Sequence, residues 1–164
     1  MREPELTIDL SDAAATESLG ADLAESLPEL GHGGLVVHLE GELGAGKTTC
    51  VRGFMRRLGV AGIVRSPTYT LVEPYVVGNL TCVHVDLYRL RHPSEVEELG
   101  LRDYLSPHCV LLIEWPDKGA GGVPPADLWI HIEYRAQARC AEMHARSTLG
   151  QTYLSRMQPL LGNN

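Results

Sequence analysis

The fold of this chain is set by one segment, Gly41-Glu42-Leu43-Gly44-Ala45-Gly46-Lys47-Thr48. The segment fits G-x-x-x-x-G-K-[ST], a pattern in which glycines bring backbone N–H groups close to phosphate oxygens and the next helix adds partial positive charge. In such a loop Lys47 reaches the β- and γ-phosphates, and the Thr48 hydroxyl binds Mg²⁺. We expect a nucleotide to be held by Glu42, Leu43, Gly44, Ala45, Gly46, Lys47 and Thr48.

The residues on both sides of the loop match what a phosphate loop needs. Leu35-Val36-Val37-His38-Leu39 is an apolar, β-branched run and predicts a strand. After the loop, Val51, Phe54, Met55 and Leu58 form one apolar stripe and predict a helix over 47–58. The alternative is a glycine turn that only joins a strand to a helix, and this strand–loop–helix context counts against it.

Further elements follow from patterning along the chain. We expect strands at 6–10, 80–85, 109–113, 127–134 and 139–147, an extended segment at 69–75, helices at 13–27, 95–99 and 148–161, and a loop at 116–125. Cys109 to Ile113 is continuously apolar, as in a strand buried on both faces, whereas the last two strands alternate like an antiparallel pair. These elements predict a three-layer α/β phosphate-loop domain, with a mixed, mainly parallel central sheet flanked by helices and an antiparallel portion.

Length and composition limit the classes of protein to which this chain can belong. The chain has 164 residues and a formal charge of −7, which fits one domain over 1–164. The acidic balance argues against extended binding of nucleic acid, which relies on clustered Lys and Arg. The four cysteines form no C-x-x-C pair and sit among apolar residues, so we expect buried, reduced thiols. No apolar run is long enough for a membrane helix, and we expect a cytoplasmic protein with no membrane contact.

Two carboxylates end predicted buried strands, where a phosphate-loop protein places the groups that hold its metal. Glu114 follows the most apolar strand, and Asp86 follows the strand over 80–85. Glu114 is our first choice as a metal-associated acid and could also act on the attacking water. The alternatives are a rim carboxylate for Glu114 and a turn residue for Asp86.

Other polar and aromatic residues are less decisive. Ser66 and Thr68 lie about 20 residues beyond the loop, where related enzymes sense the γ-phosphate, but Ser-Pro-Thr also forms ordinary turns. Trp115 is either a stacking or lid residue or part of the core. The seven histidines show no metal-ligand spacing and receive no role.

Five segments together resemble the TsaE (YjeE) family of small bacterial ATPases. The segments are Gly41–Thr49, Ser66–Tyr75 (SPTYTLVEPY), His84–Leu90 (HVDLYRL), Glu97–Tyr104 (EELGLRDY) and Ile113–Pro116 (IEWP). They occur in the family's order and at fitting spacing, and the resemblance runs from about Ile8 to Tyr134. It is far more specific than a phosphate loop alone.

The resemblance implies an ATPase that binds ATP and Mg²⁺ and works with two partners, TsaB and TsaD, in making threonylcarbamoyladenosine in tRNA. The partners transfer the threonylcarbamoyl group, the ATPase resets their complex between turnovers, and tRNA is contacted only indirectly. Matching motifs place Lys47, Thr48 and Glu114 in the nucleotide and metal site. Asp86, Thr68, Thr49 and Trp115 match further positions near the nucleotide.

Two other classes of function stay open from the sequence. A small-molecule kinase has similar length and topology, but kinases close an arginine-bearing lid over the phosphoryl group, and no such insertion lies over 114–127. A nucleotide-dependent switch that does not hydrolyse its ligand is the third hypothesis. The chain has no N-K-x-D guanine-reading motif, so ATP is favoured over GTP. No arginine is obviously placed to serve in cis as the finger that stabilises transition-state charge, so we expect slow hydrolysis without partners.

Overall fold

The computed structural model describes residues 5–161, and the two ends of the predicted 1–164 domain lie outside this part. Within it, seven strands form one sheet in the order β1-β7-β6-β2-β5-β4-β3. The strands are β1 (Leu6–Leu10), β2 (Leu35–Glu40), β3 (Val72–Val77), β4 (Leu80–Asp86), β5 (Cys109–Glu114), β6 (Leu128–Arg135) and β7 (Ala138–Ala145). The helices are α1 (Ala13–Glu25), α2 (Lys47–Arg57) and α3 (Thr148–Leu161), with 3-10 helices η1 (Pro93–Leu99), η2 (Leu101–Tyr104) and η3 (Pro116–Gly119). None of these described helices is both long and apolar enough to cross a membrane.

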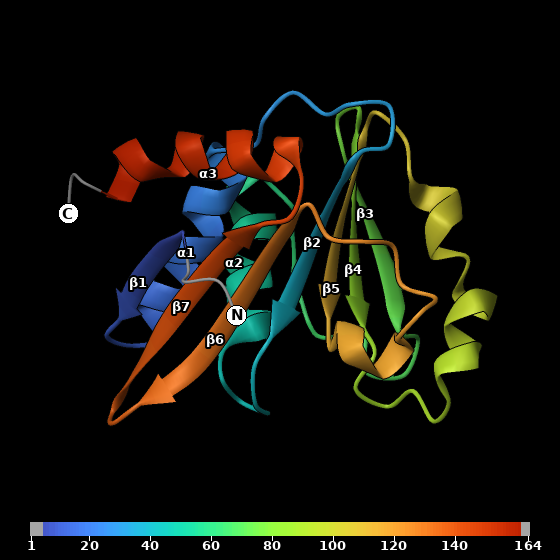
Figure 1. The fold of residues 1–164 in the computed structure, drawn as a ribbon, viewed down its shortest axis with the longest axis horizontal. Coiled ribbons are helices and arrows are strands. Elements are labelled where there is room, and N and C mark those ends of the chain that lie inside the picture. Colours follow the sequence, from blue (N-terminus) through green and yellow to red (C-terminus); the bar gives the residue numbers. More distant parts are fainter. Residues whose placement is uncertain (1–4, 162–164) are drawn as a thin grey trace.

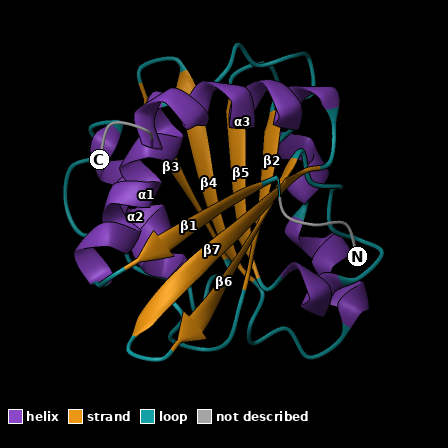
Figure 2. Ribbon diagram, turned by 60° about the vertical axis from the view of Figure 1, so that its left-hand side comes forward, coloured by secondary structure: helices purple, strands orange, loops and turns teal. Residues whose placement is uncertain are grey.

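The middle of the sheet is parallel and its edges are antiparallel. β2 lies between β5 and β6 and is parallel to both, and β4 is parallel to β5. The hairpins β3–β4 and β6–β7 and the pair β1–β7 are antiparallel. Figure 2 shows the strands fanning across the molecule. The predicted mixed sheet with an antiparallel portion is confirmed.

The sheet is covered on both faces, which confirms the predicted three layers. On one face α1, α2 and α3 enclose a buried cluster that includes Phe54 and Tyr153. On the other face the 3-10 helices over 93–104 contribute to a second cluster, in which Val96 lies with Ile113 of β5. Figure 1 shows the α-helices on one side of the sheet and the 3-10 helices on the other.

Helices α1 and α2 pack closely because each has a glycine at the contact. A Cβ atom on Gly20 would lie 1.9 Å from the Cys50 carbonyl oxygen, and one on Gly53 would lie 1.9 Å from the Glu17 carbonyl oxygen. No larger side chain fits at either position without moving a helix. The packing therefore fixes α2, and with it the functional residues at its N-terminus, against the rest of the fold.

The structure differs from three local predictions. The extended segment predicted over 69–75 becomes a strand only at Val72, because the residues before it form a turn. The helix predicted over 95–99 is a 3-10 helix that begins at Pro93, and the loop predicted over 116–125 begins with η3. Both 3-10 helices begin at a proline, which fits the first turn of a helix.

All four cysteines are buried and free, as the sequence predicts. Burial raises the pKa of Cys50 and that of Cys82 to about 12. Because the thiolate is the reactive form, these side chains act as small apolar groups in the core.

Candidate active site

The loop between β2 and α2 takes a conformation that needs its glycines. Gly41 and Gly46 have φ values of 141° and 117°, in the left-handed region. A Cβ atom on Gly41 would also lie 2.2 Å from the Ile132 carbonyl oxygen of β6. Gly46 is the N-cap of α2, so the helix begins where the loop ends. The predicted strand, glycine loop and helix are therefore present in this order.

Lys47 is buried and folds back over the loop. Its Nζ donates hydrogen bonds to the carbonyl oxygens of Gly41 at 2.6 Å and Glu42 at 2.8 Å. The same atom lies 4.1 Å from the centroid of the Trp115 ring. Burial lowers the pKa of the Lys47 ammonium, while nearby carboxylates, of which Glu114 has the largest effect, act in the opposite direction. A buried cation with these neighbours is well suited to an anionic ligand.

The two predicted carboxylates lie side by side at the ends of neighbouring parallel strands. Asp86 of β4 is the register partner of Glu114 of β5. Their chain neighbours Val85 and Ile113 belong to the cluster on the 3-10 side of the sheet. Since side chains alternate along a strand, both carboxylates lie on the α2 side. Glu114 is 2% exposed and Asp86 is 7% exposed.

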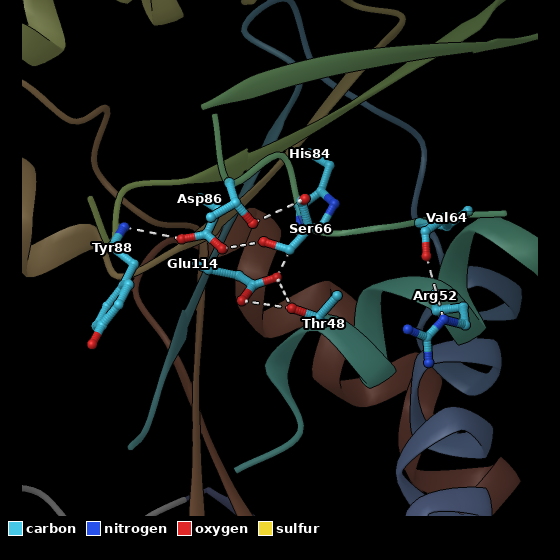
Figure 3. Close-up of polar contacts among 9 residues, drawn as sticks. Thr48, Arg52, Val64, Ser66, His84, Asp86, Tyr88 and Glu114 are labelled. Carbon is cyan, nitrogen blue, oxygen red and sulfur yellow. Dashed lines mark hydrogen bonds and ion pairs between the residues drawn. The ribbon is translucent and has the colours of Figure 1, made fainter. Parts of the chain in front are cut away.

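Hydroxyl groups from two other segments meet these carboxylates (Figure 3). The Thr48 hydroxyl donates to Glu114, with Oγ1 2.9 Å from Oε1 and 3.1 Å from Oε2. The Ser66 hydroxyl donates to Oδ2 of Asp86, and the Tyr88 N–H donates to its Oδ1 at 2.9 Å. The α2 N-terminus, the segment at Ser66 and the ends of β4 and β5 therefore converge on one place.

His84 is a site residue that sequence reasoning missed. It is fully buried, and its Nε2 lies 2.7 Å from Oε1 of Glu114. The spacing of His84 and Asp86 is a signal that could have found it, because residues two apart on a strand share a face. What the sequence lacked was the register that sets β4 beside Glu114.

A cavity of about 430 Å³ opens over these groups. Its lining contains eleven residues that the sequence analysis considered: Leu43, Gly44, Gly46, Lys47, Thr48, Thr49, Ser66, Thr68, Asp86, Glu114 and Trp115. Two predicted loop residues are not among its lining. Ala45 is buried in the core, and Glu42 contributes its carbonyl oxygen to Lys47 and lines a neighbouring hollow.

Tyr88 and Arg89 also line the cavity and were not predicted. The Arg89 guanidinium carbon lies 4.9 Å from the centroid of the Tyr69 ring. The sequence shows no arginine obviously placed to stabilise the transition-state charge, but in the structure Arg89 lies on the cavity wall. The position of Arg89 depends on the turn after β4, which the sequence pattern does not specify. Trp115 both lines the cavity and packs on the second core cluster, with its ring centroid 4.9 Å from that of Tyr88.

The donor set at the cavity floor fits Mg²⁺ bound together with phosphates. It consists of the hydroxyl oxygen of Thr48 and the carboxylate oxygens of Glu114, and the Ser66–Asp86 pair lies beside it. Mg²⁺ prefers oxygen ligands, keeps several waters and is usually held by one or two carboxylates plus substrate phosphates. No group of three or more His, Cys, Asp or Glu side chains among the described residues could hold a metal by itself.

Comparison with known proteins places the chain in a family. A family model described as "Threonylcarbamoyl adenosine biosynthesis protein TsaE" matches residues 10–143. The tRNA threonylcarbamoyladenosine biosynthesis protein TsaE of Haemophilus influenzae is 46% identical over 121 residues, which cover 74% of this chain and 77% of that protein. The protein of the same name from Synechocystis is 39% identical over 122 residues, covering 72% and 74%.

A solved structure has the same fold. The crystal structure of YdiB from Bacillus subtilis matches with a TM-score of 0.75 and 25% identity, and the match covers 100% of both chains. The family model spans the phosphate loop and the ends of both β4 and β5, so it includes Lys47, Asp86 and Glu114. The chain therefore belongs to the TsaE family.

Proposed function

We propose that this chain is a Mg²⁺-dependent ATPase that serves the tRNA threonylcarbamoyladenosine machinery in the cytoplasm, where it supports turnover of a TsaB–TsaD transfer complex. The observation that carries the proposal is the Thr48–Glu114 hydrogen bond at the N-terminus of α2, in the cavity that Lys47 also lines. Because one sheet joins all the described strands, we assign residues 1–164 to this one ATPase domain.

The proposal gives a defined task to the main polar residues of the cavity. The loop N–H groups and the Lys47 ammonium bind the β- and γ-phosphates, and Thr49 adds a contact after the loop. Thr48 and Glu114 would hold Mg²⁺, which when bound shields the phosphate charge. The Asp86 carboxylate, held by Ser66, is placed to orient a water near the γ-phosphate.

Thr68 and Trp115 complete the nucleotide site in the proposal. Both line the cavity, and the Trp115 ring lies against the Lys47 ammonium. An aromatic ring over a cation stabilises it at this position without neutralising its charge. The Thr68 hydroxyl donates to the Ser66 carbonyl oxygen at 3.3 Å, and in this proposal it turns to a phosphate oxygen when the nucleotide binds.

Hydrolysis is favoured over transfer to a small molecule. The residues between β5 and β6 form η3 and a short loop without an arginine, so they provide no arginine-bearing lid. The two carboxylates lie close to the place where a water would attack, which a switch that only binds nucleotide does not need. These observations leave the kinase and the non-hydrolysing switch without specific support.

Partner dependence is proposed from the open rim of the cavity. Leu43, which lines the cavity, is 66% exposed, and Tyr69, whose ring contacts the cavity residue Arg89, is 85% exposed. Bulk water at an open site weakens the electrostatic interactions that stabilise a phosphoryl transition state. The net charge of −7 argues that tRNA is held chiefly by the partners.

The test of the proposed function is the ATPase rate of the purified chain with and without TsaB and TsaD. We expect slow hydrolysis by the chain alone and faster hydrolysis with both partners, together with threonylcarbamoyladenosine formation in tRNA. Omission of Mg²⁺ should abolish the stimulated rate. Rapid turnover by the chain alone that the partners leave unchanged would contradict the partner-dependent role.

Replacement of Arg89 by Ala should lower the hydrolysis rate more than it lowers ATP affinity. A guanidinium on the cavity wall can stabilise charge that develops in the transition state, and such arginines contribute about 10³-fold or more in other phosphoryl-transfer enzymes. We expect a loss of at least about tenfold in kcat, because the cavity is open. Arg91→Ala, an exposed arginine two residues away, is the matched control. An unchanged rate for Arg89→Ala would remove this residue from the mechanism.

A further inference from the structure

His84 lies directly behind Glu114 in the sheet. Its side chain is fully buried, and its Nε2 lies 2.7 Å from Oε1 of Glu114. Figure 3 shows the imidazole on β4, the carboxylate at the end of β5 and the Thr48 hydroxyl near this carboxylate, and Thr48 lines the cavity. Glu114 thus lies between a buried histidine and the residue at the start of α2.

The hydrogen bond between His84 and Glu114 involves one carboxylate oxygen of Glu114 more than the other. A carboxylate that binds a metal only accepts hydrogen bonds, so in the His84 tautomer that suits this role Nε2 donates to Oε1 of Glu114. Oε1 of Glu114 accepts from His84 and, at 2.9 Å, from Thr48, whereas Oε2 has only the 3.1 Å contact with Thr48. Oε2 therefore keeps the larger free acceptor capacity toward the cavity.

The other ring nitrogen of His84 argues against a role in packing alone. Nδ1 is buried and has no hydrogen-bond partner among the described residues. Burying a polar atom without a partner destabilises the fold, and an apolar side chain of similar size would avoid this cost. The imidazole is therefore explained better by its contact with Glu114 than by filling space.

We infer that His84 is a positioning residue that orients the Glu114 carboxylate for Mg²⁺ and the attacking water. Residues that hydrogen-bond a metal-binding side chain fix its orientation, and their loss commonly reduces metal affinity or activity about 10- to 100-fold. This inference rests on the proposed ATPase function. The inference adds His84 to Asp86 and Glu114, the site residues that β4 and β5 contribute. The phosphate-loop motif specifies none of these three residues.

Three substitutions separate the hydrogen bond from the volume of the side chain. His84→Met keeps a similar volume and removes the donor. His84→Gln keeps an N–H donor near the position of Nε2, whereas the amide of His84→Asn ends closer to the backbone and does not reach Glu114. His144→Gln is the control, because His144 is also buried but lies on β7 beside Trp129.

The measurements are calorimetric ATP binding in EDTA, the Mg²⁺ concentration that gives half-maximal hydrolysis, and kcat with the partners present. For His84→Met and His84→Asn we expect unchanged ATP affinity in EDTA, about 10- to 100-fold more Mg²⁺ needed for half-maximal rate, and a lower kcat. His84→Gln should restore most of the wild-type Mg²⁺ requirement and most of the wild-type kcat. His144→Gln should match the wild type in both.

The outcomes distinguish this inference from the proposed function. If wild-type protein neither binds nor hydrolyses ATP, the proposed function fails before any variant is compared. If the wild type is active and the Met and Asn variants have its Mg²⁺ requirement and kcat, the positioning role is overturned. Should His84→Met not fold, the Gln and Asn variants carry the comparison, and equal Mg²⁺ requirements for these two would also overturn it.

Discussion

Lys47→Ala should lose tight binding of ATP. The Lys47 ammonium is buried within the loop and is the cation closest to where the loop places the β- and γ-phosphates. Removing one partner of a buried, hydrogen-bonded charge pair costs about 2–5 kcal/mol, and each 1.4 kcal/mol is tenfold in affinity. We therefore expect Kd for ATP to rise about 100-fold or more, measured by calorimetry with and without Mg²⁺.

The chain provides a matched control for this substitution. Lys118 on η3 is the only other lysine of the sequence, and its Nζ lies 5.8 Å from the centroid of the Tyr88 ring. Lys118→Ala should bind ATP within about twofold of the wild type, since surface charges beyond the binding contact are screened. Thermal unfolding of both variants checks that the loop persists without the hydrogen bonds that Lys47 gives to Gly41 and Glu42. Wild-type ATP affinity in a folded Lys47→Ala protein would refute the phosphate-loop interpretation.

The loop, its two flanking elements and the strand ends could be predicted because each depends on residues close in sequence. The run over 35–39 and the stripe from Val51 to Leu58 define a strand and a helix by local spacing alone. Glu114 and Asp86 could be selected because they end apolar strands, and parallel strands bring such ends to one edge of the sheet. Local sequence patterns therefore identified most of the residues that line the cavity.

The contacts of His84 and Arg89 could not be predicted, since they depend on how distant segments meet. His84 touches Glu114 only because β4 and β5 are parallel neighbours in one particular register. Arg89 reaches the cavity because the chain turns after β4 and brings its guanidinium over Tyr69. The spacing of His84 and Asp86 shows that the two residues share a face of β4, but it does not show that this face lies beside Glu114. Arg89 has no such signal in its spacing.

Glu114→Gln should suppress Mg²⁺-dependent hydrolysis while sparing the fold. The amide oxygen can still accept a hydrogen bond from His84 or Thr48, whereas Ala would leave the buried Nε2 of His84 unpaired at a cost of roughly 1–3 kcal/mol. Loss of the negative charge removes a metal ligand and a group that can act on water, so kcat should fall about 100-fold or more. ATP binding in EDTA should be equal to or tighter than that of the wild type, because one carboxylate near the phosphates is neutral.

The comparison with Asp86→Asn decides between the two carboxylates. Asp86 accepts from Ser66 and from the Tyr88 N–H, and neither of these donors comes from the phosphate loop. Its loss should therefore lower kcat without raising the Mg²⁺ requirement, whereas Glu114→Gln should change both. Glu142→Gln on β7, where the carboxylate pairs with Arg135, is the control for removal of one charge. If Glu114→Gln keeps the wild-type rate and Asp86→Asn does not, the catalytic role belongs to Asp86, and the hydrogen bond from Thr48 to Glu114 serves only to hold the start of α2 against β5.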